Sequence, residues 1–445
     1  MTPGDLHCKI PFELVEAVLA DCVHETLLSC SLVCQSWLPS CRPRLFKSLE
    51  IASPQRCDQL ARILESEQCT IPSSIRKLKF NFTQCRLGQE LGSDHFEEDN
   101  QAFYCIDYIL MISMRLKDKV SSLKKLTIIF DGLALLSPSN GDSYLTKPLS
   151  TDCRNTLASQ LISAFGHVDE LDLQLYKELP SDLIAFTTSF ARLKYLKMHS
   201  GVIWSQDDDW ELPATSNHRL SSSLHTLELG GGDDYVDADG SHLYYEWLYA
   251  YCPPGLLNLS VYRVEVREGR LSTQPVPDIQ PFLTTPRLRF LHLGFDTWYV
   301  PFRNSGIYYD LSAPQHLEEL VISIRNLIDD EPDVVLLNLL RTMLNTLTSP
   351  RLRRITFNVY GSGFRVLPEE WDALDGLLAS EKFSSVAVEL VVPFSDKTID
   401  DGTSEEDLPK ARGTFSRGWG SETEEDAEYF QDGEVIDWVC CRYWC

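Results

Sequence analysis

A short strand pattern recurs along most of this chain, and it limits the fold more than any other feature. The pattern is leucine, two variable residues, leucine, one variable residue and an apolar residue, as in Leu224, Leu227 and Leu229. Ten segments carry it or a close variant, with second anchors at positions 78, 126, 171, 196, 227, 259, 291, 320, 355 and 386. Alternate residues of a strand point to the same face, so each segment predicts one short strand that buries two side chains.

The spacing of the anchors leaves room for a helix after most strands. Seven of the nine gaps between anchors are 25–35 residues long, and the first two are 48 and 45. Ser53 followed by Pro54 predicts the start of one helix, because serine caps helices and proline suits their first turn. Apolar stripes at helical spacing predict further helices within 157–165, 183–190, 334–347 and 371–378.

The repeated strand and helix over residues 52–394 resemble an irregular leucine-rich-repeat domain. The resemblance implies an α/β solenoid, curved into a horseshoe, in which the residue between the two buried side chains of each strand faces the concave side. The regular asparagine of such repeats is missing, so we expect an uneven array. A collection of unrelated αβ units is the alternative, and the near-constant period argues against it.

Residues 5–51 carry a different pattern, made of three short helical segments. Apolar residues recur at helical spacing after Pro11, and a second helix is expected over 24–38, ended by Pro39. A short third element is expected over 42–46. Three such segments are too short to bury themselves as a domain, so we expect their apolar faces to need a partner's surface. An ordinary small helical bundle is the alternative.

The order of residues in this segment is more specific than its periodicity. Ile-Pro-Phe-Glu-Leu at 10–14, Cys-Ser-Leu-Val-Cys at 30–34 with Trp37, and Arg-Pro-Arg-Leu-Phe at 42–46 together resemble the F-box. Ile10 stands where leucine is usual, which keeps the apolar character. The resemblance implies that residues 5–51 bind a Skp1-type adaptor and, through it, a cullin. The implied contact residues are Ile10, Pro11, Leu14, Val18, Leu28, Leu32, Val33 and Trp37.

An F-box ahead of leucine-rich repeats implies the substrate-recognition subunit of an SCF-type (Skp1-cullin-F-box) ubiquitin ligase. Such a subunit is not an enzyme and needs no cofactor, because it only positions a protein substrate. The sequence agrees in having no phosphate-binding loop, no zinc-protease pattern and no nucleophile elbow. The alternative function is a leucine-rich-repeat interaction scaffold that takes no part in ubiquitination.

Three long segments that follow strands combine carboxylates with aromatic residues. They lie at 204–220, 230–251 and 295–309, and loops after nearby strands are expected to lie on one rim. Aromatic residues are frequent at binding hot spots, and carboxylates favour a basic partner. The candidate substrate rim is Asp208, Trp210, Tyr235, Tyr244, Trp247, Trp298 and Tyr299. The alternative is that the aromatic residues cover the repeat core and the carboxylates are merely solvated.

The charge of the chain limits the classes of partner that it can bind. The net charge of the chain is −25, which disfavours binding to nucleic acid or to an anionic membrane surface. Residues 395–445 are expected to form a largely disordered acidic tail, because 396–437 hold fourteen Asp or Glu against four Lys or Arg. Neither a signal peptide nor a membrane-spanning run is visible, so we expect a cytoplasmic or nuclear location.

Overall fold

The computed structural model describes thirteen parts of the chain. They are residues 12–33, 37–66, 69–81, 109–130, 151–176, 180–201, 219–230, 248, 255–265, 279–296, 309–325, 334–360 and 368–391. The chain divides into two compact units, Met1–Asp208 and Asp209–Cys445. Both units combine helices with parallel strands, which confirms the α/β class predicted from the sequence.

The first unit begins with three helices, α1 (Phe12–Ala20), α2 (His24–Val33) and α3 (Leu38–Leu45). Strands and helices then alternate. The strands are β1 (Ser48–Ile51), β2 (Lys77–Asn81), β3 (Lys125–Phe130), β4 (Glu170–Tyr176) and β5 (Tyr195–Gly201). The helices are α4 (Pro54–Leu64), α5 (Ile71–Ser74), α7 (Thr151–Phe165) and α8 (Pro180–Thr188).

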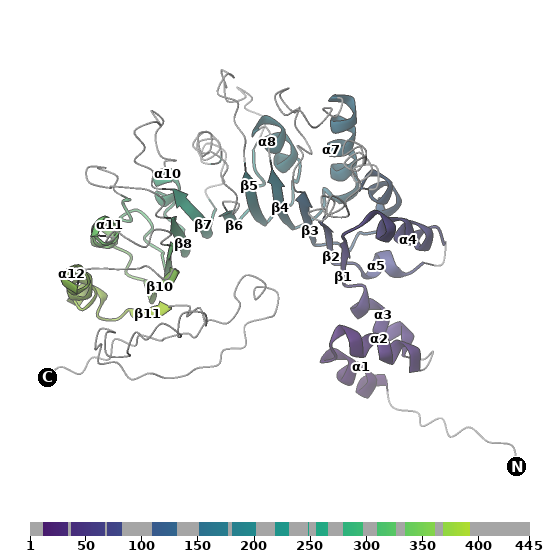
Figure 1. Ribbon diagram of the computed structural model, residues 1–445, viewed down its shortest axis with the longest axis horizontal. Coiled ribbons are helices and arrows are strands. Elements are labelled where there is room, and N and C mark those ends of the chain that lie inside the picture. The colour runs from purple at the N-terminus through teal and green to yellow at the C-terminus, as the bar shows by residue number, and fades with distance from the viewer. Residues whose placement is uncertain are drawn as a thin grey trace, which may run out of the picture. The chain divides into compact units, whose positions relative to one another are not determined.

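The strands of the first unit pair in chain order, each parallel to the next. Their leucine anchors are direct register partners, in the order Leu49, Leu78, Leu126, Leu171 and Leu196. The last four anchors are buried, and Phe80 packs against Phe165 of α7 with ring centroids 6.3 Å apart. Figure 1 shows α7 and α8 on the same side of these strands. The core of the unit therefore lies between the anchor face of the strands and the helices.

The second unit repeats this arrangement. Its strands are β6 (Thr226–Gly230), β7 (Asn258–Glu265), β8 (Phe290–Asp296), β9 (Glu319–Arg325), β10 (Arg354–Tyr360) and β11 (Ala387–Val391). Its helices are α10 (Gln280–Leu283), α11 (Val334–Thr346), α12 (Pro368–Leu378) and the short 3-10 helix η3 (Glu381–Phe383). The strands again pair in parallel and in chain order, and the anchors Leu227, Leu259, Leu291, Leu320 and Ile355 are register partners, with Val388 of β11 opposite Ile355.

Local sequence accounts for these elements. Nine of the ten predicted segments form strands, β2 to β10, that contain the predicted anchor. The tenth is shifted by two residues: Phe383 lies in η3, the predicted anchor Val386 precedes β11, and Val388 lies opposite Ile355. Ser53 caps α4, since its side-chain oxygen accepts a hydrogen bond from the amide of Arg56 at 3.3 Å, and Pro54 occupies the first turn. The residue before a strand links it to the next strand: the carbonyl of Lys47 accepts hydrogen bonds from the amides of Arg76 and Lys77, at 2.8 and 2.9 Å.

Three details differ from the sequence-based expectations. The second helix is described only as far as Val33, and Pro39 does not end it but lies in the first turn of α3, where its missing N–H costs nothing. Strand β1 falls within the predicted N-terminal segment yet pairs with β2. Residues 109–116 are helical and bury Ile109, Ile112 and Leu116. Their spacing of three and four residues is a helical signal that a search for strand anchors passes over.

Candidate functional site

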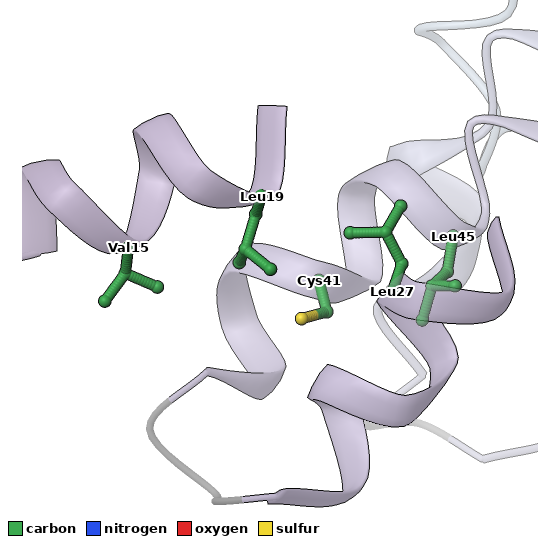
Figure 2. Packing of buried hydrophobic residues seen from close by; sticks show 5 residues of the cluster. All are labelled: Val15, Leu19, Leu27, Cys41 and Leu45. Carbon is green, nitrogen blue, oxygen red and sulfur yellow. The ribbon is translucent and has the colours of Figure 1, made fainter. Parts of the chain in front are cut away.

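Helices α1, α2 and α3 enclose a small core. Helix α3 contacts both of the others. Five buried side chains meet between the helices, as Figure 2 shows: Val15, Leu19, Leu27, Cys41 and Leu45. Leu19 and Cys41 have no exposed surface. The cluster therefore does bury a core of its own, although a small one, because α3 supplies the third wall that the first two helices lack.

The same three helices leave a large amount of apolar surface exposed. Of the seven large hydrophobic side chains that are exposed in the described residues, five belong to α1, α2 or the turn between them. Leu32 is 87% exposed. The other four, Leu14, Val18, Val23 and Leu28, are between 47% and 61% exposed. Leu14 and Val18 are four residues apart on α1, as are Leu28 and Leu32 on α2, so each helix has an exposed apolar face. Exposed apolar faces of this kind indicate an interaction surface.

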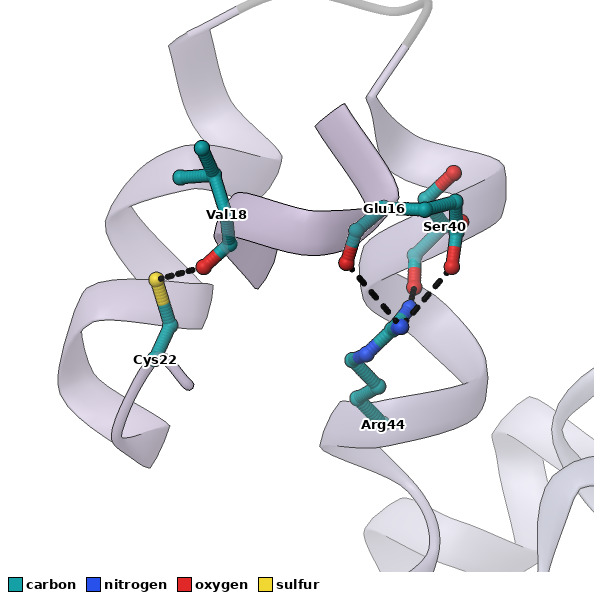
Figure 3. A network of polar contacts seen from close by, with 5 residues as sticks. All are labelled: Glu16, Val18, Cys22, Ser40 and Arg44. Atoms are coloured by element: carbon teal, nitrogen blue, oxygen red, sulfur yellow. Dashed lines mark hydrogen bonds and ion pairs between the residues drawn. The ribbon is translucent and has the colours of Figure 1, made fainter. Parts of the chain in front are cut away.

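A polar network fixes α1 against α3. Figure 3 shows the guanidinium of Arg44 between two groups, the side chain of Glu16 and the carbonyl of Ser40. Arg44 Nη2 donates to Glu16 Oε2 at 2.8 Å, and Nη1 donates to the Ser40 carbonyl at 3.1 Å. The hydrogen bond from Arg44 lowers the pKa of the Glu16 carboxyl below its ordinary value of 4.5. The contact helps to orient α1 and so its exposed apolar side chains.

The helical cluster joins the repeats with almost no linker. Only Phe46 and Lys47 separate the end of α3 from the start of β1. Phe46 packs against the cluster core, while the carbonyl of Lys47 is hydrogen-bonded to the start of β2. Helix α3 also contacts α5 of the repeat region. These contacts tie the exposed apolar surface to the first strands through packed and hydrogen-bonded residues.

The sequence-predicted adaptor residues fall into three groups. Leu14, Val18, Leu28 and Leu32 are all exposed and lie on α1 and α2. Trp37 instead packs against the cluster core and precedes α3 as its cap residue. Val33 is the last residue of α2, but its side chain lies outside the described part of the chain, as do Ile10 and Pro11 altogether.

The predicted substrate rim is not part of the described structure. Asp208, Trp210, Tyr235, Tyr244, Trp247, Trp298 and Tyr299 all fall outside the described residues, and so does the predicted acidic tail. The rim and the tail therefore stay predictions.

A second surface was missed by the sequence analysis. It is a pocket of about 370 Å³ at the beginning of strands β2 to β5, with Arg76, Lys124, His167 and Arg192 among its lining residues. These side chains come from separate repeats, so no local sequence pattern joins them. The sequence contained one sign of this surface, which is the position of two cations: Arg76 and Lys124 each immediately precede the first residue of a strand.

In the described parts of the chain, no group of three or more histidine, cysteine or acidic residues is placed to hold a metal ion. Among the same residues, no helix combines the length and apolar character needed to cross a membrane. Comparison with models of known protein families found no family that matches the chain, and a search of curated proteins found no matching protein.

Proposed function

We propose that this protein is the substrate-recognition subunit of an SCF-type ubiquitin ligase. Helices α1 to α3 act as an F-box that docks a Skp1-type adaptor, and the adaptor links the chain to a cullin. The repeats act as a leucine-rich-repeat-like solenoid that holds a protein substrate near the ubiquitin-charged enzyme. The chain itself performs no chemistry in this role, because its contribution is a high effective concentration of substrate.

The exposed apolar surface of α1 and α2 is the observation that carries this proposal. Leu14, Val18, Leu28 and Leu32 match the F-box residues implied by the sequence resemblance, and all four are exposed to solvent. Fully burying a leucine or valine side chain is worth about 1.5–3 kcal/mol. Covering these four residues would therefore supply a substantial part of the free energy of a stable complex.

The repeats support the second half of the proposal. Strand anchors that are register partners from Leu78 to Leu196, and again from Leu227 to Ile355, are what a leucine-rich-repeat-like array needs. Many of the residues between the anchors are polar, and some of them form ion pairs across neighbouring strands. Lys79, for example, lies 3.3 Å from Glu50, and Lys125 lies 3.9 Å from Asp172. Residues of this kind offer a protein substrate charged contacts over a long surface.

Introducing carboxylates into the exposed apolar surface of α2 tests the contact with the adaptor. The variant L28D/L32D places two carboxylates on α2 without touching the buried core. We expect its affinity for a purified Skp1-type adaptor, measured by calorimetry, to fall by more than about 100-fold, since buried hot-spot residues are typically worth about 2 kcal/mol or more each. The thermal midpoint of the isolated variant should stay unchanged.

A matched control is available in the same unit. Ile63 and Met114 are 47% and 57% exposed and lie outside the three-helix cluster. The variant I63D/M114D makes the same change in charge and polarity there and should bind the adaptor as the wild type does. Equal loss in both variants, or no loss in L28D/L32D, would contradict the proposed docking surface.

Binding of a cullin distinguishes the proposed ligase subunit from the alternative, an interaction scaffold that takes no part in ubiquitination. Purified chain, adaptor and cullin should co-elute as one complex in size-exclusion chromatography, and L28D/L32D should remove the chain from it. A complex of chain and adaptor that excludes the cullin would favour an interaction scaffold outside ubiquitination. Trp37 is unsuitable for this experiment, because it packs against the cluster core and its loss would also disturb folding.

A further inference from the structure

The pocket at the beginning of strands β2 to β5 is basic, although the chain as a whole has a net charge of −25. Arg76, Lys124, His167 and Arg192 line it, with Asp169 as its one acidic lining residue. A local excess of positive charge in a strongly acidic chain opposes the overall composition. The acidic residues of the chain already provide the charge that keeps it soluble. The cluster of positive charge therefore needs another explanation.

Two of the basic lining residues occupy equivalent positions, since Arg76 and Lys124 immediately precede β2 and β3, whereas His167 and Arg192 lie three residues before the start of β4 and β5. The residues immediately before β1 to β5 are Lys47, Arg76, Lys124, Asp169 and Lys194, and four of these five are cations. Backbone hydrogen bonds align them: the carbonyl of Arg76 accepts from the amides of Lys124 and Lys125, at 2.8 and 3.0 Å. Neighbouring strands lie about 4.8 Å apart, so β2 and β5 are separated by roughly 14 Å. The cations thus form a row.

Most of this positive charge is not neutralised by the protein. Lys194 forms an ion pair with Asp169 at 3.3 Å. Among the described residues, Arg76, Lys124 and Arg192 form no ion pair with a carboxylate, and Lys124 and Arg192 are exposed. Three cationic side chains along one pocket repel one another in the empty state. An anionic ligand would relieve that repulsion.

Arg76 is held in position before any ligand binds. Its Nη1 donates to the carbonyls of Ser73 and Ser122, at 3.1 and 3.3 Å. Ser122 Oγ in turn donates to the carbonyls of Ser73 and Ile75, at 2.8 and 3.0 Å. These bonds use Nη1 and leave the N–H groups of Nε and Nη2 for a ligand. A guanidinium fixed in this way loses little conformational entropy on binding a carboxylate.

The arrangement favours a peptide over other anions. A single small anion would meet only part of a row that extends over several strands. A nucleic-acid backbone carries closely and evenly spaced charges, one of which would fall against Asp169, and its length would increase repulsion by the acidic chain. An extended peptide of about five residues covers roughly 14 Å and can place a neutral residue opposite Asp169.

We infer that the row of cations before β2 to β5 is a binding site for a short acidic segment of a partner protein, whose carboxylates pair with Arg76, Lys124 and Arg192. The inference does not rest on adaptor docking, which uses α1 and α2. It places a basic surface at the beginning of β2 to β5, whereas the segments of the predicted acidic rim come after β5, β6 and β8 in the sequence. The two surfaces would then select partner segments of opposite charge.

Peptide binding tests the inference directly. The probe is a short fluorescein-labelled peptide that alternates glutamate with serine, and its binding to the full chain is followed by fluorescence anisotropy at low salt. We expect K124E/R192E to weaken binding at least about tenfold, because charges paired across an interface control affinity and its salt dependence. The milder K124Q/R192Q should weaken it less. Circular dichroism should give unchanged thermal midpoints, since both residues are exposed.

The control variant changes the same charge elsewhere. Arg56 and Arg62 are exposed residues of α4, so R56E/R62E lowers the net charge equally and should leave peptide binding within about twofold of the wild type. Four outcomes would overturn the inference. They are equal binding of the peptide with glutamine in place of glutamate, equal loss in R56E/R62E, tighter binding of a single-stranded oligonucleotide of the same charge, and displacement of the peptide by inorganic phosphate beyond the effect of ionic strength.

Discussion

His292 shows how the repeat array controls the chemistry of a single side chain. It lies in β8, in the row of residues between the buried anchors, with Ser260 and Val321 as its register partners. Its Nε2 lies 2.8 Å from Ser323 Oγ. Burial lowers the pKa of the His292 imidazole from 6.5 to about 4, because the charged form loses its hydration. His292 is therefore neutral in the folded protein at pH 7.

This shift predicts a pH-dependent stability. Between pH 6.5 and about 4 the unfolded chain binds a proton at His292 that the folded chain does not, so stability falls as pH falls through that window. The expected loss is about 2 kcal/mol at pH 5. Urea denaturation of the wild type and H292Q at pH 7 and pH 5 measures it. The variant should lose less stability over this interval, and parallel losses in the two proteins would contradict the assignment.

Among the leucines and valines of the N-terminal helices, neighbouring residues have opposite roles. Val18 is exposed and Leu19 is fully buried, although both fit the same apolar pattern. The pattern predicts that the helix has an apolar face. It does not predict which residues of that face are buried by the rest of the protein. That depends on α3, which reaches Leu19 and leaves Val18 in solvent.

At the scale of one element, α4 offers the sharpest agreement between sequence and structure. Ser53, Pro54 and the apolar stripe behind them predict a capped helix, and α4 begins where predicted. Its inner face buries Cys57, Leu60, Ala61 and Leu64. Capping signals are local, so they can be read without knowledge of the remaining fold.

The cap makes a measurable prediction. Replacing Ser53 with alanine removes the acceptor for the Arg56 amide and should destabilise α4 by about 1 kcal/mol. Amide hydrogen exchange should become faster at Arg56, whereas S53D should keep the protection of the wild type because aspartate also caps helices. Unchanged exchange at Arg56 in S53A would mean that the hydrogen bond contributes little.

Helix α3 was predicted only in part, as a short element over 42–46. Its two prolines, Pro39 and Pro43, argue locally against a helix over Leu38–Leu45. Pro39 lies in the first turn, where no N–H is needed, whereas Pro43 lies inside the helix. Burial of Cys41 and Leu45 against α1 and α2 offsets the cost at Pro43. Tertiary packing here overrides local propensity.

At the scale of the molecule, acidity is the dominant property. The chain carries a net charge of −25 at pH 7 and has an isoelectric point near 4.8. Self-repulsion keeps such a chain dispersed at neutral pH and disappears near the isoelectric point. Solubility, measured as the concentration left after centrifugation, should therefore pass through a minimum near pH 4.8. A minimum above pH 6 would show that association is controlled by something other than net charge.

The strand pairing within each unit connects neighbours along the chain. When each strand pairs only with the strands before and after it in sequence, stability is close to a sum of the contributions of single strand–helix units and of the interfaces between neighbours. This locality explains why the strand positions could be predicted at all. The residues between the anchors were harder to predict, because they pair across strands, as Lys125 does with Asp172 at 3.9 Å.

The sequence by itself determined the α/β class, nine of the ten predicted strands and the alignment of their anchors, because a leucine spacing repeated at a near-constant period leaves strands few other registers. The last segment has no leucine at its anchor positions, and its strand begins after the predicted anchor Val386. Only the tertiary structure decided which apolar residues of α1 and α2 remain exposed and which cations share a pocket. Exposure depends on where α3 packs, and Arg76, Lys124 and Arg192 meet only because successive parallel strands begin at the same edge. Both candidate surfaces therefore depend on contacts between residues far apart in sequence.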